Sequence, residues 1–344
     1  PLFEWYVSCP EFEVRGAGFP GSPNLLVGGT AGVEDPTYVP VAWSMCGAAS
    51  DLGDCFELAL NQDGTQYRFG SGFDPIVSRP EPIIVKNPPG TTPPMRTEPF
   101  TVQETFWGPI IPELESRTAY VSGRRRAEGL TGPEAQAIID DPNEVIPRYA
   151  FTDATGLIGP TSRASAPEIP FLAHDRMYRS SGIDEFLTAV REDYSYPAAN
   201  MTIAAGDGQI GFTITGAIPV RRPAPEVVNP NQAQLRRKWA GRLPMKARWV
   251  GNRWQEFMPP ELRPFGKNPA KGYFHNGNQS GVFFDHPLAC YYASPSGDGE
   301  RSFFLRRYVD RKIAEGAGTM QRADLEALSQ SRQREVGPLV AKLI

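Results

Sequence analysis

The sequence contains few cysteines, few histidines and no long hydrophobic run, and each absence excludes a class of protein. Four cysteines among 344 residues are too few for a disulfide-stabilised scaffold, and none has the CxxC spacing of a zinc site. Three histidines leave little from which to build a multi-histidine metal centre. No segment approaches the ~18 consecutive apolar residues that a membrane-spanning helix requires.

The sequence also lacks an excess of positive charge. The chain has 35 lysines and arginines against 39 aspartates and glutamates, a net charge of −4. Domains that bind nucleic acid usually carry a clear positive excess, so this balance argues against that class. Trp239, Trp249 and Trp254 lie near basic residues and could form a nucleic-acid patch, but their scattered spacing favours buried aromatics.

Glycine and proline are abundant, with 34 and 35 residues, which favours short strands joined by turns over a bundle of long helices. Short apolar runs predict strands that include residues 25–27, 39–43, 65–69, 82–86, 100–106 and 118–122. Apolar periodicity predicts helices at 131–141, 183–192, 303–313 and 325–343. This order of strands, a helix, a hairpin and further helices indicates an α+β fold with antiparallel sheets.

We expect residues 1–344 to form a single domain, with a proline-rich covering segment at about 221–270. The chain begins at Pro1 with no Met and no signal peptide, and it stops at Ile344 inside an apolar-periodic stretch. Natural termini are usually polar, so we interpret both ends as cuts. The alternative at the C-terminal end is a natural helix that packs on the core.

Residues Gly206–Gly211 match the GxGxxG pattern of dinucleotide-binding sites. That fingerprint must follow a strand and begin a helix, so that the helix N-terminus meets the pyrophosphate. Here the third glycine lies inside 210–215, which is typical of a strand. We therefore predict a hairpin turn. Ser181 and Asp184 resemble a capping box at the start of the helix at 183–192.

The signatures of several hydrolase classes are missing, since the sequence has no GxSxG, HExxH or GxxxxGK[ST] motif. His174-Asp175 and Asp285-His286 could each supply a base to a serine, but no nucleophile elbow accompanies either pair. We interpret these histidines as structural or surface residues.

A set of short motifs occurs in an order that is informative even though each motif is weak alone. The motifs are PLFEWY at 1–6, FEVRG at 12–16, FPG at 19–21, VAWS at 41–44, DLGD at 51–54, EPIIVK at 81–86, GPI at 108–110, TAY at 118–120, GDGQIG at 206–211, TGAIPVR at 215–221 and NP with GY at 268–273, followed by Asn276 and Asn278. Their order and spacing over nearly the whole chain resemble the penicillin acylase (penicillin amidase) family of N-terminal nucleophile hydrolases.

The resemblance implies a fold and a mechanism. The fold is a four-layer αββα sandwich with two antiparallel sheets, truncated here at both ends to a central fragment of the catalytic β part. In the family, a precursor cleaves itself to expose an N-terminal serine, which attacks an amide. The α-amino group of that serine acts as the base, since its pKa lies near ~8. By this resemblance the serine lies upstream of Pro1, so residues 1–344 by themselves should be inactive.

Site residues follow from the same resemblance. The tetrahedral oxyanion needs donors aimed at it in advance, and the alignment gives this role to the Asn200 side chain and the Gly47 backbone N–H. The substrate-binding residues that it implies are Phe3, Met45, Cys46 and Arg221. The plainer alternatives are that Asn200 caps a strand end, Gly47 serves a turn, Phe3 is a core residue and Arg221 is a surface charge.

The segment DLGD falls where the family binds calcium. The resemblance implies a structural calcium ion held by Asp51, the Gly53 carbonyl and Asp54, and oxygen ligands of these kinds are those that calcium prefers. The alternative is that both aspartates only form a turn. No organic cofactor is expected.

The chain also departs from the family pattern. Trp107 replaces the usual histidine before GPI, Ala205 replaces an aspartate, and the family's GHN turn corresponds to Gly28–Thr30 with extra residues up to Pro40. The leading hypothesis is an acylase that cleaves an acyl group from an amide. The alternatives are an inactive family-like scaffold that binds a small ligand, and an unrelated carbohydrate-binding sandwich.

The resemblance also implies partners and a location. The expected partners are a small-molecule amide substrate, together with the α chain and the remaining β segments of the same processed precursor. Neither nucleic acid nor a membrane span is expected. By resemblance, the protein would be periplasmic or secreted.

Overall fold

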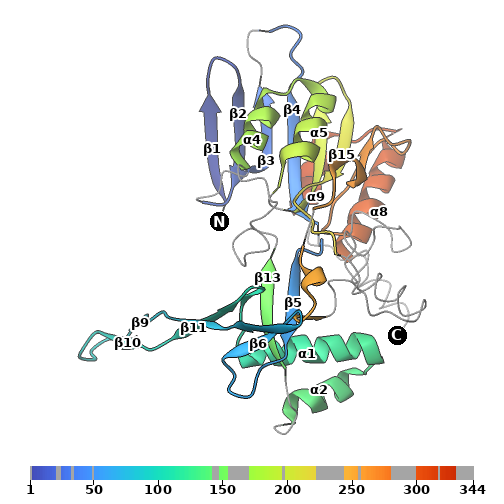
Figure 1. Cartoon of the computed structure of the whole chain (residues 1–344). Helices are drawn as coiled ribbons and strands as arrows, with labels where there is room; N and C mark the ends of the chain where they lie inside the picture. The colour runs from blue at the N-terminus through green and yellow to red at the C-terminus, as the bar shows by residue number, and fades with distance from the viewer. Residues whose placement is uncertain are drawn as a thin grey trace. The chain divides into compact units, whose positions relative to one another are not determined.

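The computed structural model describes residues 2–20, 25–31, 35–48, 50–141, 147–153, 170–195, 198–221, 244–254, 257–279, 300–316 and 318–330. The chain divides into two compact units, each assembled from separate stretches of sequence (Figure 1). Unit 1 comprises Pro1–Ser50, Pro167–Ile218 and Met258–Ile344, and unit 2 comprises Asp51–Ala166 and Pro219–Phe257. The single domain expected over 1–344 stays a prediction.

Unit 1 is built on an antiparallel sheet that, within the described residues, has seven strands in the order β1-β2-β3-β4-β14-β15-β17. Its strands are β1 (Phe3–Ser8), β2 (Glu13–Gly18), β3 (Leu25–Ala31), β4 (Val41–Gly47), β14 (Ala199–Ala205), β15 (Ile210–Ile214) and β17 (Phe265–Lys267). Strands β4 and β14 are central neighbours although more than 150 residues of sequence separate them.

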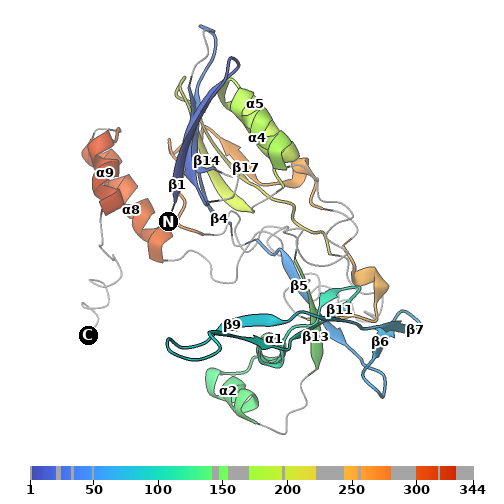
Figure 2. The same cartoon turned by 90° about the vertical axis from the view of Figure 1, so that its left-hand side faces the viewer.

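Two helices, α4 (Pro170–Arg179) and α5 (Gly182–Asp193), cover one face of this sheet (Figure 2). Helix α5 is amphipathic, and Ile183, Phe186 and Val190 on its apolar face are buried in the core. Trp43 from β4 packs against Phe186 with ring centroids 5.3 Å apart, and its indole N–H donates to the Leu25 carbonyl. Helices α8 (Glu300–Glu315) and α9 (Arg322–Gln330) lie on the opposite side of the sheet.

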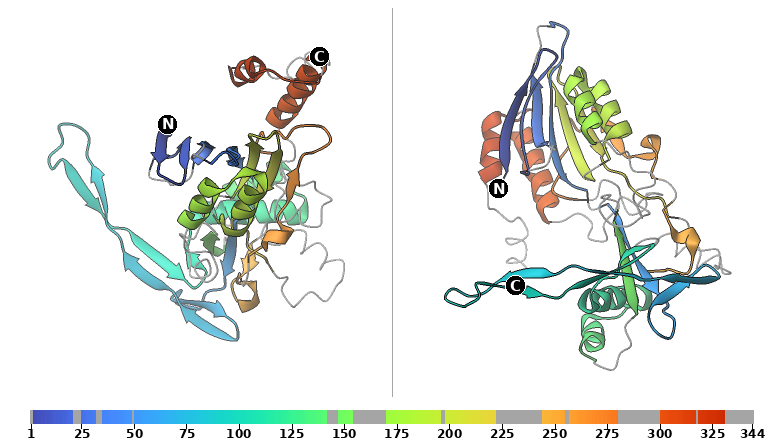
Figure 3. Two further views of the ribbon diagram at one scale, coloured as in Figure 1. Left: turned by 90° about the horizontal axis from the view of Figure 1, so that it is seen from above. Right: turned by 60° about the vertical axis from the view of Figure 1, so that its left-hand side comes forward.

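Unit 2 contains smaller sheets and a ribbon. Strand β5 (Gly53–Leu58) pairs antiparallel with β13 (Arg148–Asp153) and parallel with β16 (Met245–Lys246). The other strands are β6 (Gln66–Phe69), β7 (Gly72–Pro75), β8 (Val77–Pro80), β9 (Ile83–Lys86), β10 (Met95–Glu98), β11 (Thr101–Thr105) and β12 (Gly108–Pro109). The β8–β11 pair continues into the β9–β10 pair as a long two-stranded ribbon (Figure 3).

The core of unit 2 is aromatic. Phe56 stacks on Trp107 with centroids 4.1 Å apart, and Tyr67 is fully buried beside them. Helices α1 (Glu113–Glu128) and α2 (Gly132–Asp140) and the short 3₁₀ turns η1 (Val250–Asn252) and η2 (Pro260–Leu262, in unit 1) complete the described elements. Helix α2 begins with a capping box in which the Thr131 hydroxyl and the Glu134 side chain exchange hydrogen bonds with each other's backbone.

Several predicted elements are confirmed. Gly206–Gly211 joins β14 to β15 as a hairpin. Gly208 has φ +87°, and the Asp207 side chain accepts a hydrogen bond from the Gln209 N–H, both of which are typical of a tight turn. A dinucleotide site would need a helix to begin here, so the nucleotide-binding interpretation is wrong. The predicted helices at 131–141, 183–192 and 303–313 correspond to α2, α5 and α8. Of the helix predicted at 325–343, the residues up to 330 are helical in α9, and the remainder lies outside the described residues.

Two local predictions are wrong. Residues 118–122 lie in helix α1 and do not form a strand. Ser181 does not cap α5 with its side chain, because its hydroxyl instead accepts a hydrogen bond from the Val39 N–H at 2.9 Å.

The covering segment predicted at 221–270 consists of short 3₁₀ turns and strands where it is described, and residues 222–243 and 255–256 lie outside the described residues. No helix among the described residues is long and apolar enough to cross a membrane.

Candidate functional site

The structure brings Asn200 and Gly47 together on the two central strands of unit 1. In the β4–β14 register, Asn200 faces Cys46 and Ala199 faces Gly47, so Gly47 lies one position along from Asn200 on the adjacent strand. Adjacent strands lie about 4.8 Å apart, so the backbones of the two residues are diagonal neighbours in the sheet. Asn200 is 1% exposed, whereas Gly47 is at the surface.

A short segment after β17, His275–Gln279, holds both residues by hydrogen bonds. The Asn200 Nδ2 donates to the Gln279 carbonyl at 2.8 Å and lies 3.4 Å from the Asn276 Oδ1. The Asn276 Nδ2 donates to the Asn200 backbone carbonyl at 3.2 Å, and the Asn278 Nδ2 donates to the Gly47 carbonyl at 3.2 Å. We call His275–Gln279 the asparagine segment.

The other atom of the Asn200 amide has a different environment. Its Oδ1 is buried, and no donor among the described residues lies within hydrogen-bond distance of it. A buried amide oxygen without a donor costs free energy of the order of a lost hydrogen bond, about 1–3 kcal/mol. Buried polar groups almost always have a hydrogen-bond partner, so this amide oxygen is an exception in the interior of unit 1.

Strand alternation separates two residues that the resemblance assigned to one pocket. Met45 faces α4 and α5, where the Tyr194 hydroxyl lies 3.5 Å from its sulfur, and it is 9% exposed. Cys46 falls on the opposite face, together with Asn200, and is half-buried. Only one of the pair can therefore line a cleft with Asn200.

Phe3 is not brought to Asn200 either. It lies on β1, the edge strand, which is three places from β4 in the sheet, and 60% of Phe3 is exposed. It shares the side-chain direction of Trp5, which packs against the core beneath α4 and α5. Phe3 therefore points away from the face that carries Asn200.

Arg221 is a buried structural cation in unit 2. Its Nε donates to both Asp54 oxygens, at 3.1 and 2.9 Å, and its Nη1 donates to the Asp51 carbonyl at 2.9 Å. Trp254 adds an indole N–H donor to the Asp54 Oδ2 at 2.5 Å. The side chains of Arg221 and Asp54 are 0% and 1% exposed, so this arginine does not reach a substrate in this arrangement and is not a surface charge.

Comparison with known proteins places the chain in a family. The family model described as penicillin amidase matches residues 2–343. The chain belongs to the penicillin amidase family. It is 25% identical over 283 residues to an acyl-homoserine lactone acylase, QuiP, of Pseudomonas fluorescens, a match that covers 81% of the chain and 27% of that protein. It is 23% identical over 322 residues to the penicillin G acylase of Escherichia coli, which covers 91% of the chain and 30% of that protein.

A solved structure supports the same fold. The thermostable penicillin G acylase of Alcaligenes faecalis superimposes with a TM-score of 0.57 at 17% identity, covering 90% of this chain and 44% of that one. The chain spans about three tenths of the length of the curated penicillin amidase relatives that it matches. The α+β class predicted from the sequence is confirmed.

The calcium site expected for a penicillin amidase can be tested against the donors at Asp51 and Asp54. Both carboxylates turn toward one cation, and that cation is the Arg221 guanidinium, which lies 3.5 Å from the Asp51 Oδ1. Within the described residues there is no group of three or more acidic, histidine or cysteine side chains that could hold a metal. A calcium ion at Asp51, Gly53 and Asp54 stays a prediction that this arrangement does not fit.

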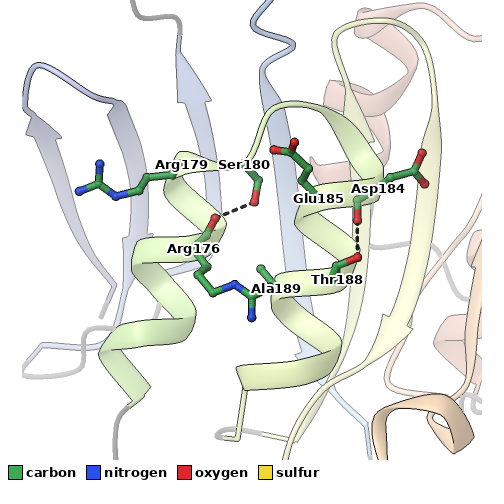
Figure 4. A pocket seen from close by; sticks show the side chains of 7 residues that line it. All are labelled: Arg176, Arg179, Ser180, Asp184, Glu185, Thr188 and Ala189. Atoms are coloured by element: carbon green, nitrogen blue, oxygen red, sulfur yellow. Dashed lines mark hydrogen bonds between the residues drawn. The ribbon is translucent and has the colours of Figure 1, made fainter.

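A separate hollow of about 420 Å³ lies on the outer side of α4 and α5 (Figure 4). Its lining residues are Arg176, Arg179, Ser180, Asp184, Glu185, Thr188 and Ala189. Arg176 and Arg179 are engaged in ion pairs with neighbouring acids, and the helices separate this hollow from the sheet face that carries Asn200. The hollow is therefore not part of the Asn200 site.

The remaining sequence candidates have structural surroundings. His174 is 5% exposed and packs between Tyr178 and Tyr194, as expected for a structural histidine. Trp254 is buried against Arg221, and Asp285-His286 and Trp239 lie outside the described residues. Sequence reasoning did not give the asparagine segment a role in the site, although its motif of asparagines after NP and GY was the available signal.

Proposed function

We propose that the protein containing this chain is an amide hydrolase that removes an acyl group from an amide. Membership of the penicillin amidase family supports this, and so do the acylase names of the two curated relatives. The single structural observation that carries the proposal is the buried Asn200 amide beside the surface-facing Gly47 backbone on the central strands.

In the proposed mechanism, a serine exposed by self-cleavage lies upstream of Pro1 and attacks the amide carbonyl. Its α-amine accepts the hydroxyl proton and later delivers a proton to the leaving amine. The developing oxyanion accepts hydrogen bonds from the Asn200 Nδ2 and the Gly47 N–H. The 3.4 Å contact of the Asn200 Nδ2 with the Asn276 Oδ1 is long enough for the stronger, charged acceptor to displace it.

The other parts of the proposal concern substrate and setting. The acyl-homoserine lactone and penicillin G named for the relatives both carry an acyl group on an amide nitrogen, and this is the substrate class proposed. The described sheets would form part of an αββα sandwich completed by the α chain and the other β segments of the precursor. A periplasmic or secreted location belongs to the same proposal.

The alternative function is a family-like scaffold that binds a small ligand without cleaving it. The observation in its favour is that one Asn200 Nδ2 hydrogen is already donated to the Gln279 carbonyl. A donor committed in this way is less available to an oxyanion than a free one.

The two functions are separated by one experiment on the parent protein. Purified parent protein and its Asn200→Ala variant are incubated with penicillin G or an acyl-homoserine lactone, and release of the primary amine is measured. An acylase releases amine, and Asn200→Ala lowers kcat by roughly 10²–10³. Because this variant also leaves the Gln279 carbonyl without its donor, the thermal midpoint is measured alongside to show that the variant is folded. Binding of either compound with no release of amine would identify the scaffold instead.

A further inference from the structure

We infer that Asn276 and Asn278 are positioning residues, which fix the Asn200 and Gly47 donors relative to each other. This inference rests on the proposed function and names further residues of the same site. Each asparagine donates its side-chain N–H to the backbone carbonyl of one partner: Asn276 to Asn200 and Asn278 to Gly47. A single short segment therefore holds both strands at the point where the donors lie.

The two asparagines are also joined to each other. The Asn276 Oδ1 accepts the Asn278 backbone N–H at 3.0 Å, which fixes the spacing between the two side chains. Asn278 has φ +65°, and Asn268 is the only other non-glycine residue with positive φ in the described part of the chain. Asparagine tolerates this left-handed conformation better than most residues, so the local backbone favours this residue type.

Helix α8 supports the segment from the other side. The Arg301 Nη2 donates to the Asn278 Oδ1 at 2.6 Å, so both ends of the Asn278 amide are engaged. A Cβ on Gly277 would lie 2.8 Å from the Ser302 backbone nitrogen, closer than real Cβ contacts, so a larger residue would push the segment off α8. Helix α8 therefore holds the Asn278 side chain through Arg301, and Asn278 in turn holds the Gly47 carbonyl.

The chemical consequence concerns the orientation of the Gly47 peptide. The hydrogen bond is made to the Gly47 carbonyl, in the 47–48 peptide, and it restrains the neighbouring 46–47 peptide, whose N–H is the second proposed oxyanion donor, through the φ and ψ angles of Gly47. Gly47 has no side chain to restrain it, and a Cβ there would sit only 3.4 Å from the Asn278 Nδ2. Misplacement of a catalytic group by about 1 Å can cost up to about 10²-fold in rate, so loss of this bond should act on kcat.

The test uses Asn278→Gly in the parent protein, because glycine accepts positive φ and introduces no charge. We expect kcat to fall by about 10- to 100-fold, with KM changed by less than about twofold. The loss of two hydrogen bonds should lower the thermal midpoint by only a few degrees, so the variant stays folded at the assay temperature. Asn278→Asp keeps the acceptor for Arg301 but loses the donor to Gly47, and should lower kcat at least as much. Asn268→Gly is the matched control, since Asn268 also has positive φ, at 45°, and should retain wild-type kcat.

The outcomes separate this inference from the proposed function. If Asn200→Ala abolishes turnover while Asn278→Gly keeps kcat within twofold of wild type, the positioning role is wrong and the acylase function stands. A fall in kcat for Asn278→Asp alone would also overturn it, because the new charge and not the lost donor would then be responsible. If the wild-type parent and all variants lack turnover, the proposed function itself fails.

Discussion

Replacement of the buried cation Arg221 by methionine should destabilise the protein strongly. Arg221→Met leaves the Asp54 carboxylate, which is 1% exposed, with the Trp254 indole as its remaining donor among the contacts described. Removal of one partner from a buried ion pair typically costs about 3–5 kcal/mol, because an uncompensated charge stays in the interior. At about 2–4 °C per kcal/mol for a unit of this size, the thermal midpoint should fall by roughly 6–20 °C.

The assay is calorimetry of the parent protein with two comparison variants. Arg79→Met removes an arginine that is 51% exposed and paired with Glu81 and Glu104 at the surface, and it should change the midpoint far less. The double variant Arg221→Met/Asp54→Asn should recover much of the loss, since the fully buried charge at position 54 is then removed and the amide oxygen introduced there can still accept from Trp254. Equal effects of Arg221→Met and Arg79→Met would refute the reasoning.

The same variants decide the question of calcium. Because the guanidinium already neutralises Asp54, calcium or a chelator should not shift the wild-type midpoint through this site. In Arg221→Met the freed carboxylates should respond to calcium with a rise in midpoint. A calcium-dependent rise in the wild type that Asp54→Asn abolishes would show that the metal and not the arginine is the resident cation.

Two further predictions concern titrating groups in unit 2. Burial, with a smaller contribution from the Asp54 carboxylate, raises the pKa of Cys55 to about 11. Its alkylation, followed by peptide mapping, should be slow at pH 8, where about one thiol in a thousand is ionised, and should rise about tenfold per pH unit toward pH ~11. A plateau below pH 9 would contradict this. Burial also raises the pKa of Tyr67 to about 12 from 10.0, so its stabilising contribution is complete below pH ~10 and is lost as the pH rises toward 12. The free energy of unfolding should therefore fall less steeply between pH ~10 and 12 in Tyr67→Phe than in the wild type, and an identical pH dependence in the two proteins would contradict this prediction.

Sequence reasoning succeeded where the cause of a structure is local. The hairpin at Gly206–Gly211 follows from glycines and an aspartate between two strand-like runs, and α5 follows from apolar spacing. The sequence-based predictions failed where the partner of a side chain lies far away in the sequence. The Ser181 hydroxyl meets a backbone N–H 142 residues away, and Arg221 meets Asp54 across 167 residues. No local pattern contains either pairing.

One site assignment depended on where a strand ends. The strand was predicted only at 39–43, so Met45 and Cys46 lay beyond its predicted end. In the structure β4 continues to Gly47, and because consecutive side chains in a strand point to opposite faces, Met45 lies in the core and Cys46 on the Asn200 face. Asn200 and Gly47 came together as neighbours because their motifs lie on strands that pair, which the family resemblance contained and spacing alone did not.

The pairing of β4 with β14 has a consequence for synthesis of the chain. The first sheet strands, β1 to β4, leave the ribosome before the long insertion at 51–166 that belongs to unit 2, and the partner strand β14 follows only afterwards. Until then the apolar residues of β4 lack both α5 and β14, and the strand presents an open edge that invites mispairing. Long-range pairing of this kind also slows folding. Nascent chains released before residue 205 should therefore depend on holding chaperones far more than chains released after residue 220.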